Sequence, residues 1–327
     1  MIDRKLYVDL NGFKQKIHIK GDPNKNIILF LHGGPGAANR HMCCKLNQDL
    51  LDDFMVVGWD QRGTGGSYWG CDVNTLTIDQ LVEDTQALVK YLCDTYKKEK
   101  IFTVGGSWGS LLGIRHAYKH PENLYAFLGF GQFVDGELNE KLSYEFAYEE
   151  AKKANDVESL KTLDEIGAPV MAMYKNGYTD LKRQREVMNK YGGYSKKNQP
   201  KSYTGGLAKA YLTSGEYSPL DITGVLLGST MIMNKMWEEI GKVKLENDNT
   251  KFECPILIFD GRLDKNTPAD LVEGYYKKIK APYKELIWFD EAGHNPLIDC
   301  AEDFKDLLKD RFHKAERGEL CKKRKTK

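Results

Sequence analysis

A glycine-flanked serine constrains the fold of this chain more than any other feature. Residues Gly105–Gly109 read Gly-Gly-Ser-Trp-Gly, between an apolar run, Ile101–Val104, and a stretch of helical character, Leu111–Lys119. A strand, a G-x-S-x-G turn and a helix in this order are typical of a nucleophile elbow, a strained turn that exposes a serine hydroxyl above a sheet. Glycines are needed there because larger side chains would collide with the strand and the helix. The segment therefore predicts that Ser107 is a nucleophile; the alternative is a glycine-rich turn with a solvated serine.

A second glycine-rich segment, residues 32–36, reads His-Gly-Gly-Pro-Gly and directly follows the apolar run Ile27–Leu31. Oxyanion loops of the H-G type follow a strand in this way, and residues without side chains let the backbone approach a substrate. We expect the N–H groups of Gly34 and Trp108 to form the oxyanion hole. The alternative is that the segment is only a flexible turn.

Candidate partners for the serine follow in the chain order Ser, Asp, His. Asp264 comes after the apolar run Pro255–Phe259, and His294 comes after the next run, Glu285–Phe289. Open α/β sheets place their sites beyond the carboxyl ends of such strands. His294 would take the serine proton, and Asp264 would fix its tautomer. Asp260 competes for the acid role, but it lies nearer the strand, where a turn or an inward hydrogen bond is its simpler function.

Three motifs together resemble one known family. The segments HGGPG at 32–36, DQRGTGGS at 60–67 and GGSWGS at 105–110 are similar to those of the proline iminopeptidase family of α/β-hydrolases. The resemblance covers roughly residues 1–130 and 252–315. It implies the α/β-hydrolase fold with a mostly parallel eight-stranded sheet, no metal or cofactor, and release of an N-terminal residue from peptides.

Hydrophobic patterns along the chain predict how it is organised. Alternation predicts a hairpin over 6–19 with an Asn-Gly turn, and a helical period covers 76–96. Strands that alternate with helices favour a mostly parallel sheet. Asp60 and Arg62 are interpreted as an ion pair that orders the turn near the oxyanion loop. The predicted organisation is a first part of the core at 1–132, a helical cap between the sixth and seventh strands at 133–250, a second part of the core at 251–315 and a basic tail at 316–327.

Substrate selectivity is expected to come from the cap. The resemblance implies that cap carboxylates bind the α-ammonium group of a substrate, because a buried ammonium needs paired negative charge. Glu216 and the segment Trp237–Glu239 are the most site-like, since an aromatic residue stands beside each acid. The alternative for each is a solvated helix face. The candidate acids of the cap are Glu137, Glu145, Glu216, Glu238 and Glu239.

Composition excludes several classes of partner. The 48 Lys and Arg residues balance 47 Asp and Glu residues, which gives no reason to expect a nucleic-acid partner. Neither a signal peptide nor a run of 18 apolar residues is visible, so no membrane association is expected. Seven cysteines, an odd number, suggest reduced thiols in a cytoplasmic protein. The basic tail is expected to be solvated, and the oligomeric state is not indicated.

Three hypotheses of function are consistent with these patterns. The first is a serine aminopeptidase of proline iminopeptidase type, acting on small peptides. The second is a carboxylesterase or amidase that uses the same residues on a small ester or amide. The third is a non-catalytic, hydrolase-like ligand-binding protein, which the ordered set of Ser107, Asp264 and His294 disfavours.

Overall fold

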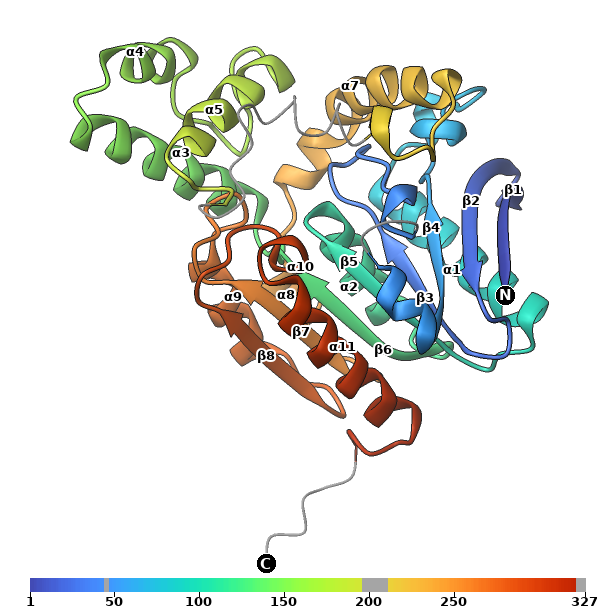
Figure 1. Cartoon of the computed structure of the whole chain (residues 1–327). Coiled ribbons are helices and arrows are strands. Elements are labelled where there is room, and N and C mark those ends of the chain that lie inside the picture. The colour runs from blue at the N-terminus through green and yellow to red at the C-terminus, as the bar shows by residue number, and fades with distance from the viewer. Residues whose placement is uncertain (44–46, 196–210, 322–327) are drawn as a thin grey trace, which may run out of the picture.

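The computed structural model describes residues 1–43, 47–195 and 211–321, so the cluster of basic residues in the predicted tail, at 322–327, lies outside the described residues. One eight-stranded sheet forms the centre of the molecule, with the strand order β1-β2-β4-β3-β5-β6-β7-β8 (Figure 1). β2 pairs antiparallel with both of its neighbours, β1 and β4, and all pairs from β4 to β8 in this order are parallel. The predicted α/β-hydrolase fold is confirmed.

Apolar runs of the sequence form the central strands. These strands are buried along almost their whole length, as expected where helices cover both faces of a parallel sheet. The first two strands form the predicted hairpin, and its turn residues Asn11 and Gly12 have φ angles of 54° and 78°. The strands are β1 Ile2–Leu10, β2 Phe13–Gly21, β3 Asn26–Leu31, β4 Phe54–Trp59, β5 Ile101–Gly106, β6 Leu124–Phe130, β7 Ile256–Gly261 and β8 Lys284–Phe289.

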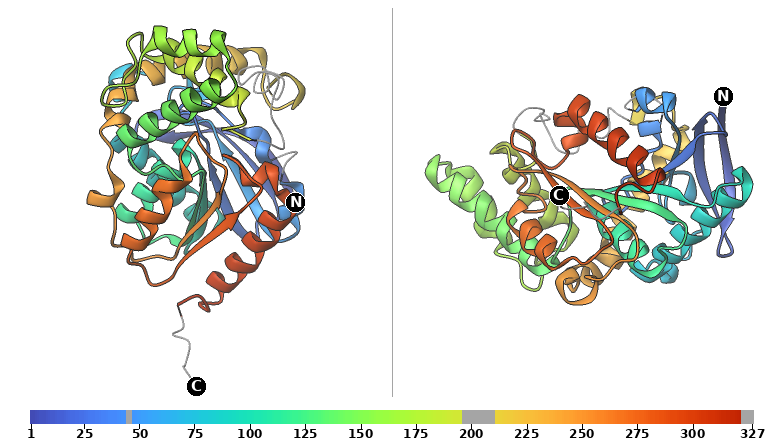
Figure 2. Two further views of the ribbon diagram at one scale, coloured as in Figure 1. Left: turned by 90° about the vertical axis from the view of Figure 1, so that its left-hand side faces the viewer. Right: turned by 90° about the horizontal axis from the view of Figure 1, so that it is seen from below.

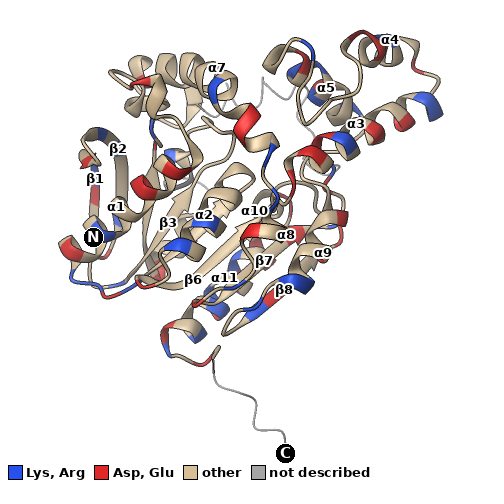
Figure 3. Cartoon of the chain, turned by 180° about the vertical axis from the view of Figure 1, so that it is seen from behind, with Lys and Arg blue, Asp and Glu red and all other residues tan. Residues whose placement is uncertain are grey.

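Helices cover the two faces of the sheet (Figure 2). One apolar cluster contains the buried side chains of α1, α2 and α9, and a second contains those of α10 and α11. Lysines and arginines are interspersed with acidic residues over these outer helices (Figure 3). The helices of the core are α1 Ile78–Tyr96, α2 Trp108–Lys119, α9 Ala269–Lys278, α10 Pro296–Asp299 and α11 Ala301–Glu316.

Further helices lie between β6 and β7 and form a cap at the edge of the sheet where β5 ends (Figure 1). Three of them, α3, α4 and α5, share an apolar cluster with Met233 of α7, and α7 also packs against the segment that contains the DQRG motif. A capping box of Ser218 and Asp221 begins α7. The helices are α3 Gly136–Lys153, α4 Val157–Ile166, α5 Tyr178–Lys190, α7 Pro219–Gly241 and the short α8 Leu245–Asp248. The limits of the cap, 133–250, stay a prediction.

The DQRG motif corrects one expectation. Asp60 and Arg62 do not pair with each other. Asp60 accepts from Arg40, with 2.8 Å between Oδ1 and Nε, and the Nε of Arg62 lies 2.6 Å from Oδ2 of Asp84. Both pairs are buried. The motif is therefore connected to Arg40, which follows β3, and to Asp84 of α1, and its own two charged residues do not pair.

A membrane-spanning helix would need a long, uninterrupted apolar stretch. Among the described ranges, no helix meets that requirement.

Candidate active site

The serine motif forms a strained turn between β5 and α2. Ser107 has φ 57° and ψ −123°, a conformation that non-glycine residues rarely adopt. A Cβ atom at Gly105 would lie 2.1 Å from the carbonyl oxygen of Gly109, and one at Gly109 would lie 2.1 Å from that of Leu31. Only glycine at both positions lets α2 approach the strands this closely. The local sequence thus dictates the geometry of the elbow.

His294 and Asp264 meet beyond the carboxyl ends of β8 and β7. The Nδ1 atom of His294 lies 2.8 Å from Oδ2 of Asp264, and both side chains are buried. The carboxylate also accepts from the Thr267 hydroxyl at 2.6 Å and from the N–H groups of Asn266 and Thr267 at 2.7 and 3.0 Å. With these donors around it, the carboxylate acts as an acceptor throughout, so Oδ2 accepts the hydrogen bond from Nδ1 of His294. The remaining nitrogen, Nε2, is therefore an acceptor.

Asp260 lies behind this pair and points inward. Its carboxylate accepts from the N–H groups of Gly131 and Gln132 at 2.8 and 3.1 Å. Burial, and secondarily the charge of Asp264, raise the pKa of Asp260 to about 7. A Cβ atom at Gly131 would lie 2.9 Å from Cε1 of His294, so the loop that Asp260 orders is in contact with the imidazole. The structure places Asp264, and not Asp260, beside Nδ1 of His294.

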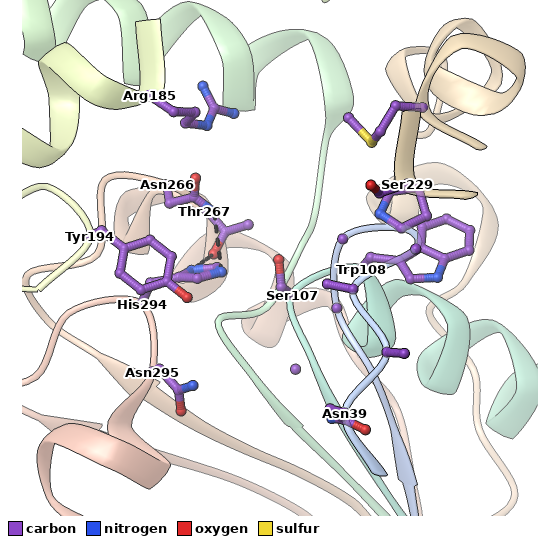
Figure 4. A pocket seen from close by; sticks show the side chains of 18 of the residues that line it. Asn39, Ser107, Trp108, Arg185, Tyr194, Ser229, Asn266, Thr267, His294 and Asn295 are labelled. Atoms are coloured by element: carbon purple, nitrogen blue, oxygen red, sulfur yellow. Dashed lines mark hydrogen bonds between the residues drawn. The ribbon is translucent and has the colours of Figure 1, made fainter. Parts of the chain in front are cut away.

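Ser107 and His294 line one pocket (Figure 4). Among the described residues, no hydrogen bond joins the Ser107 hydroxyl to the imidazole. Nε2 of His294 lies instead 3.1 Å from Nδ2 of Asn266. Ser107 and His294 thus line the same cavity.

The predicted oxyanion donors face the same cavity. Trp108 is the first residue of α2, where a backbone N–H has no partner within the helix. Gln61 of the DQRG motif joins the two loops, since its N–H donates to Nε2 of His32 at 3.1 Å and its side chain accepts from the Trp108 indole at 2.9 Å. Burial lowers the pKa of His32 to about 4, so this imidazole stays a neutral acceptor. The role of Gly34 and Trp108 as oxyanion donors stays a prediction.

The cavity has a volume of about 650 Å³ and lies between the core and the cap. Helix α7 supplies an apolar wall that includes Val225, Met233 and Trp237. Helices α3 and α5 supply a charged end with Glu140 and Arg185. A substrate in this cavity would therefore meet one apolar and one polar region of the cap.

The acids expected in the cap do not line this cavity, which corrects the expectation for Glu216, Glu238 and Glu239. Trp237 does line it, and the indole N–H donates to the Ala172 carbonyl at 2.9 Å. The acids have partners elsewhere: Glu216 pairs with Lys5 at 3.1 Å and His18 at 2.8 Å, Glu238 with Lys242, Glu137 with Lys244 and Glu145 with Lys141, and Glu239 accepts from the Ile78 N–H.

Sequence reasoning missed two adjacent polar residues of α3. Asn139 and Glu140 are 2% and 1% exposed and line the cavity. Oε1 of Glu140 accepts from Arg185 Nη2 at 2.5 Å and from Asn139 Nδ2 at 3.1 Å. The second carboxylate oxygen of Glu140, Oε2, and the amide oxygen of Asn139, Oδ1, are buried and have no hydrogen-bond partner. Their position could have been predicted to face the site, because they lie early in the first helix after β6, and β6 pairs with the elbow strand β5.

A segment of the cap, Gly193–Ser195, also contacts the loops that carry Asp264 and His294. The carbonyl of Tyr194 accepts from the His294 N–H at 2.6 Å, and that of Gly193 accepts from the Lys265 N–H at 2.9 Å. The Ser195 hydroxyl donates to Asp299 at 2.9 Å. The cap therefore helps to position His294 as well as to enclose the cavity.

This fold and this strand-turn-helix site define a class of protein. The family described as the alpha/beta hydrolase fold matches residues 26–300, so the chain belongs to that family and is a hydrolase.

Relatives narrow the class further. A probable aminopeptidase of Bacillus subtilis, YbaC, is 28% identical over 307 residues, which cover 92% of this chain and 93% of that protein. A proline iminopeptidase of Neisseria gonorrhoeae is 36% identical over 116 residues, about 35% of each chain. The resemblance to proline iminopeptidases is thereby confirmed.

Solved structures agree in fold. A proline iminopeptidase from Mycobacterium smegmatis superposes with a TM-score of 0.65 at 14% identity, covering 96% of this chain and 99% of that one. A proline iminopeptidase-related protein from Thermus thermophilus gives a TM-score of 0.64 at 21% identity, covering 98% and 99%. At these identities the likeness concerns the fold.

Proposed function

We propose that this protein is a serine aminopeptidase that releases the N-terminal residue of short peptides through an acyl-enzyme. Ser107 attacks the carbonyl carbon while Nε2 of His294 takes the hydroxyl proton, and Asp264 stabilises the imidazolium. The N–H groups of Gly34 and Trp108 bind the oxyanion. The C–N bond then breaks, and His294 gives its proton to the leaving amine. Water, activated by the same base, hydrolyses the ester and restores the serine.

The observation that carries the aminopeptidase assignment is the pair of unpartnered acceptors on α3. A buried carboxylate oxygen without a donor is costly, and ligand binding can remove this cost. Glu140 Oε2 and Asn139 Oδ1 both lack a donor and sit side by side in sequence, and Glu140 also carries the charge. An α-ammonium group has three N–H donors and the complementary charge, so it fits this pair.

The position of Asn139 and Glu140 close to His294 also suits an exopeptidase. The amine of an N-terminal residue is two bonds from the carbonyl that the serine attacks, so its anchor must lie close to the triad. Asn139 Nδ2 donates to the Asn266 carbonyl at 2.9 Å, and the side chain of Asn266 contacts His294. The name of the Bacillus subtilis relative, a probable aminopeptidase similar over almost the whole chain, supports the same proposal.

A carboxylesterase or amidase is the second candidate, and the apolar wall of α7 favours it. Val225, Met233 and Trp237 could hold a hydrophobic acyl group that has no amine. Such a substrate would make no use of Glu140.

Substitution of Glu140 separates the two candidates. Glu140→Gln keeps the size of the side chain and removes its charge, and Glu145→Gln is the matched control on the exposed face of the same helix. We expect Glu140→Gln to lower kcat/KM for free-amine aminoacyl amides by about 10–150-fold, the worth of one charge-assisted hydrogen bond. Acetylation of the substrate amine should lower kcat/KM of the wild type by the same factor. It should lower kcat/KM of Glu140→Gln little further.

Thermal melting of both variants controls for the loss of the Arg185 partner. Simple p-nitrophenyl esters without an amine should be cleaved equally by wild type and both variants. Equal wild-type rates on free and acetylated substrates would remove the aminopeptidase proposal and leave the esterase or amidase.

A further inference from the structure

The side chain of Asn266 is hydrogen-bonded to Nε2 of His294, the atom that takes the serine proton in the proposed mechanism. Its Nδ2 lies 3.1 Å from Nε2 of the imidazole. Because Asp264 accepts the Nδ1 proton at 2.8 Å, Nε2 of the neutral ring has a lone pair and no proton. The amide of Asn266 must therefore present its nitrogen, as donor, to this lone pair. The orientation of the amide follows from the hydrogen-bond network and is not an independent choice.

Ser107 needs the same lone pair. An imidazole nitrogen has a single lone pair in the ring plane, so full alignment with the amide of Asn266 excludes full alignment with the serine hydroxyl. Among residues 1–43, 47–195 and 211–321, the Ser107 hydroxyl makes no hydrogen bond to His294. The base is thus bound by a neutral donor that has no part in the proton transfer.

We infer that Asn266 is a positioning residue that withholds Nε2 of His294 from Ser107 in the free protein and releases it when substrate binds. The inference rests on the serine mechanism proposed above, but not on the identity of the substrate. It assigns a restraint on the base to a side chain that lies outside the Ser-His-Asp set.

The surroundings of Asn266 allow such a release. The main chain is held at both ends, because its N–H donates to Asp264 at 2.7 Å and its carbonyl accepts from Asn139 at 2.9 Å. The side chain is held only at Nδ2: within the described residues its amide oxygen has no partner, and Figure 4 shows that oxygen turned away from the imidazole. Rotation about the side-chain bonds therefore breaks one neutral hydrogen bond and leaves the loop in place.

The cap can sense the substrate and act on this contact. Asn139, which donates to the Asn266 carbonyl, also contributes one of the two unpartnered acceptors that α3 places in the cavity. A donor bound at Asn139 and Glu140 changes the hydrogen bonding of the same amide that fixes Asn266. A single hydrogen bond, from Asn139 to the Asn266 carbonyl, thus connects a ligand bound in the cap with the residue that restrains the base.

The direction of the effect provides the test. A fluorophosphonate probe reacts with the serine of the free protein and needs the base, but it needs no amine anchor. We expect Asn266→Ala to be labelled about twofold to tenfold faster than wild type, the worth of one neutral hydrogen bond. A merely structural role predicts the opposite, since loss of a support for His294 would slow labelling. Asn74→Ala, in an exposed turn, is the matched control and should label at the wild-type rate.

A second variant covers the case in which the alanine substitution disturbs folding. Asn266→Asp has the same shape, but a carboxylate cannot donate to Nε2 and instead favours the protonated ring, which cannot act as a base. Its labelling should be slower than that of wild type. The inference is overturned if Asn266→Ala, with an unchanged melting temperature, labels no faster than wild type, or if Asn266→Asp labels at the wild-type rate.

Failure of the proposed function has a different signature. A wild type that is labelled by the probe but cleaves no aminoacyl amide would contradict the aminopeptidase assignment and leave the comparison of the Asn266 variants intact. A wild type that resists the probe would contradict the serine mechanism itself.

Discussion

Asp264→Asn tests the assignment of the acid most directly, because the surroundings of the carboxylate dictate the outcome. Oδ1 accepts two backbone N–H groups, from Asn266 and Thr267, which an asparagine oxygen can still accept. The asparagine nitrogen must then replace Oδ2, which lies 2.8 Å from Nδ1 of His294. A donor at that place forces the imidazole to accept there and to carry its proton on Nε2.

The protonated Nε2 cannot take the proton of Ser107. We expect a loss of about 10⁴ in kcat, the size of effect that a wrong tautomer produces in a Ser-His-Asp site. The fold should persist, because the two backbone hydrogen bonds to Oδ1 survive. The assay is steady-state hydrolysis of a p-nitrophenyl ester, together with the rate of fluorophosphonate labelling and a thermal melt.

Asp260→Asn is the matched control, because it makes the same chemical change at a buried aspartate a few residues away. Both oxygens of Asp260 accept backbone N–H groups, so an asparagine nitrogen must oppose one donor from Gly131, Gln132 or Gly261. We expect a lower melting temperature and a rate loss far smaller than that of Asp264→Asn. The opposite ranking of the two rates would refute the reasoning and make Asp260 the acid.

Further perturbations give distinct expected outcomes. Ser107→Ala should abolish fluorophosphonate labelling and lower kcat by about 10³–10⁶, with an unchanged melt, and near wild-type turnover would contradict the mechanism. Burial lowers the pKa of His116 to about 3, so the unfolded chain binds this proton first as the pH falls below about 6.5. Between pH 6.5 and 4 the free energy of unfolding of wild type should therefore fall more steeply than that of His116→Gln, by up to about 1.4 kcal/mol per pH unit, and parallel urea-denaturation curves would exclude this linkage. Arg40→Met should destabilise the protein by about 3–5 kcal/mol in urea because it leaves the buried carboxylate of Asp60 without its Arg40 partner, whereas Asp221 keeps Lys16, and a loss under about 1 kcal/mol would mean that Asp60 finds other donors.

Local patterns were sufficient to predict the core. The apolar runs at 27–31, 101–104 and 255–259 became β3, β5 and β7, because a strand covered on both faces must be apolar throughout. The glycines around Ser107 predicted the elbow because their steric requirement is local. The positions of Asp264 and His294 followed from topology, since parallel strands end at one edge of the sheet.

Pairings across the fold could not be predicted in the same way. Glu140 accepts from Arg185, and Asp60 pairs with Arg40 instead of its near neighbour Arg62. Such choices depend on which elements pack together, and nothing in the adjacent sequence records them. The same holds for Glu216, whose neighbouring tyrosine suggested a binding site but whose carboxylate pairs with the N-terminal hairpin.

Under the proposed mechanism, the cap of this fold acts on the base as well as on the substrate. His294 is held through its N–H by Tyr194, and the Asn266 carbonyl is held by Asn139, so two cap elements reach the residues that surround Nε2. A change of cap therefore alters both what enters the cavity and how readily the nucleophile is activated. The three core motifs can be retained while selectivity and reactivity shift together. For this reason the identity of the substrate depends on the few cap side chains that contact the triad loops, and the motifs alone do not determine it.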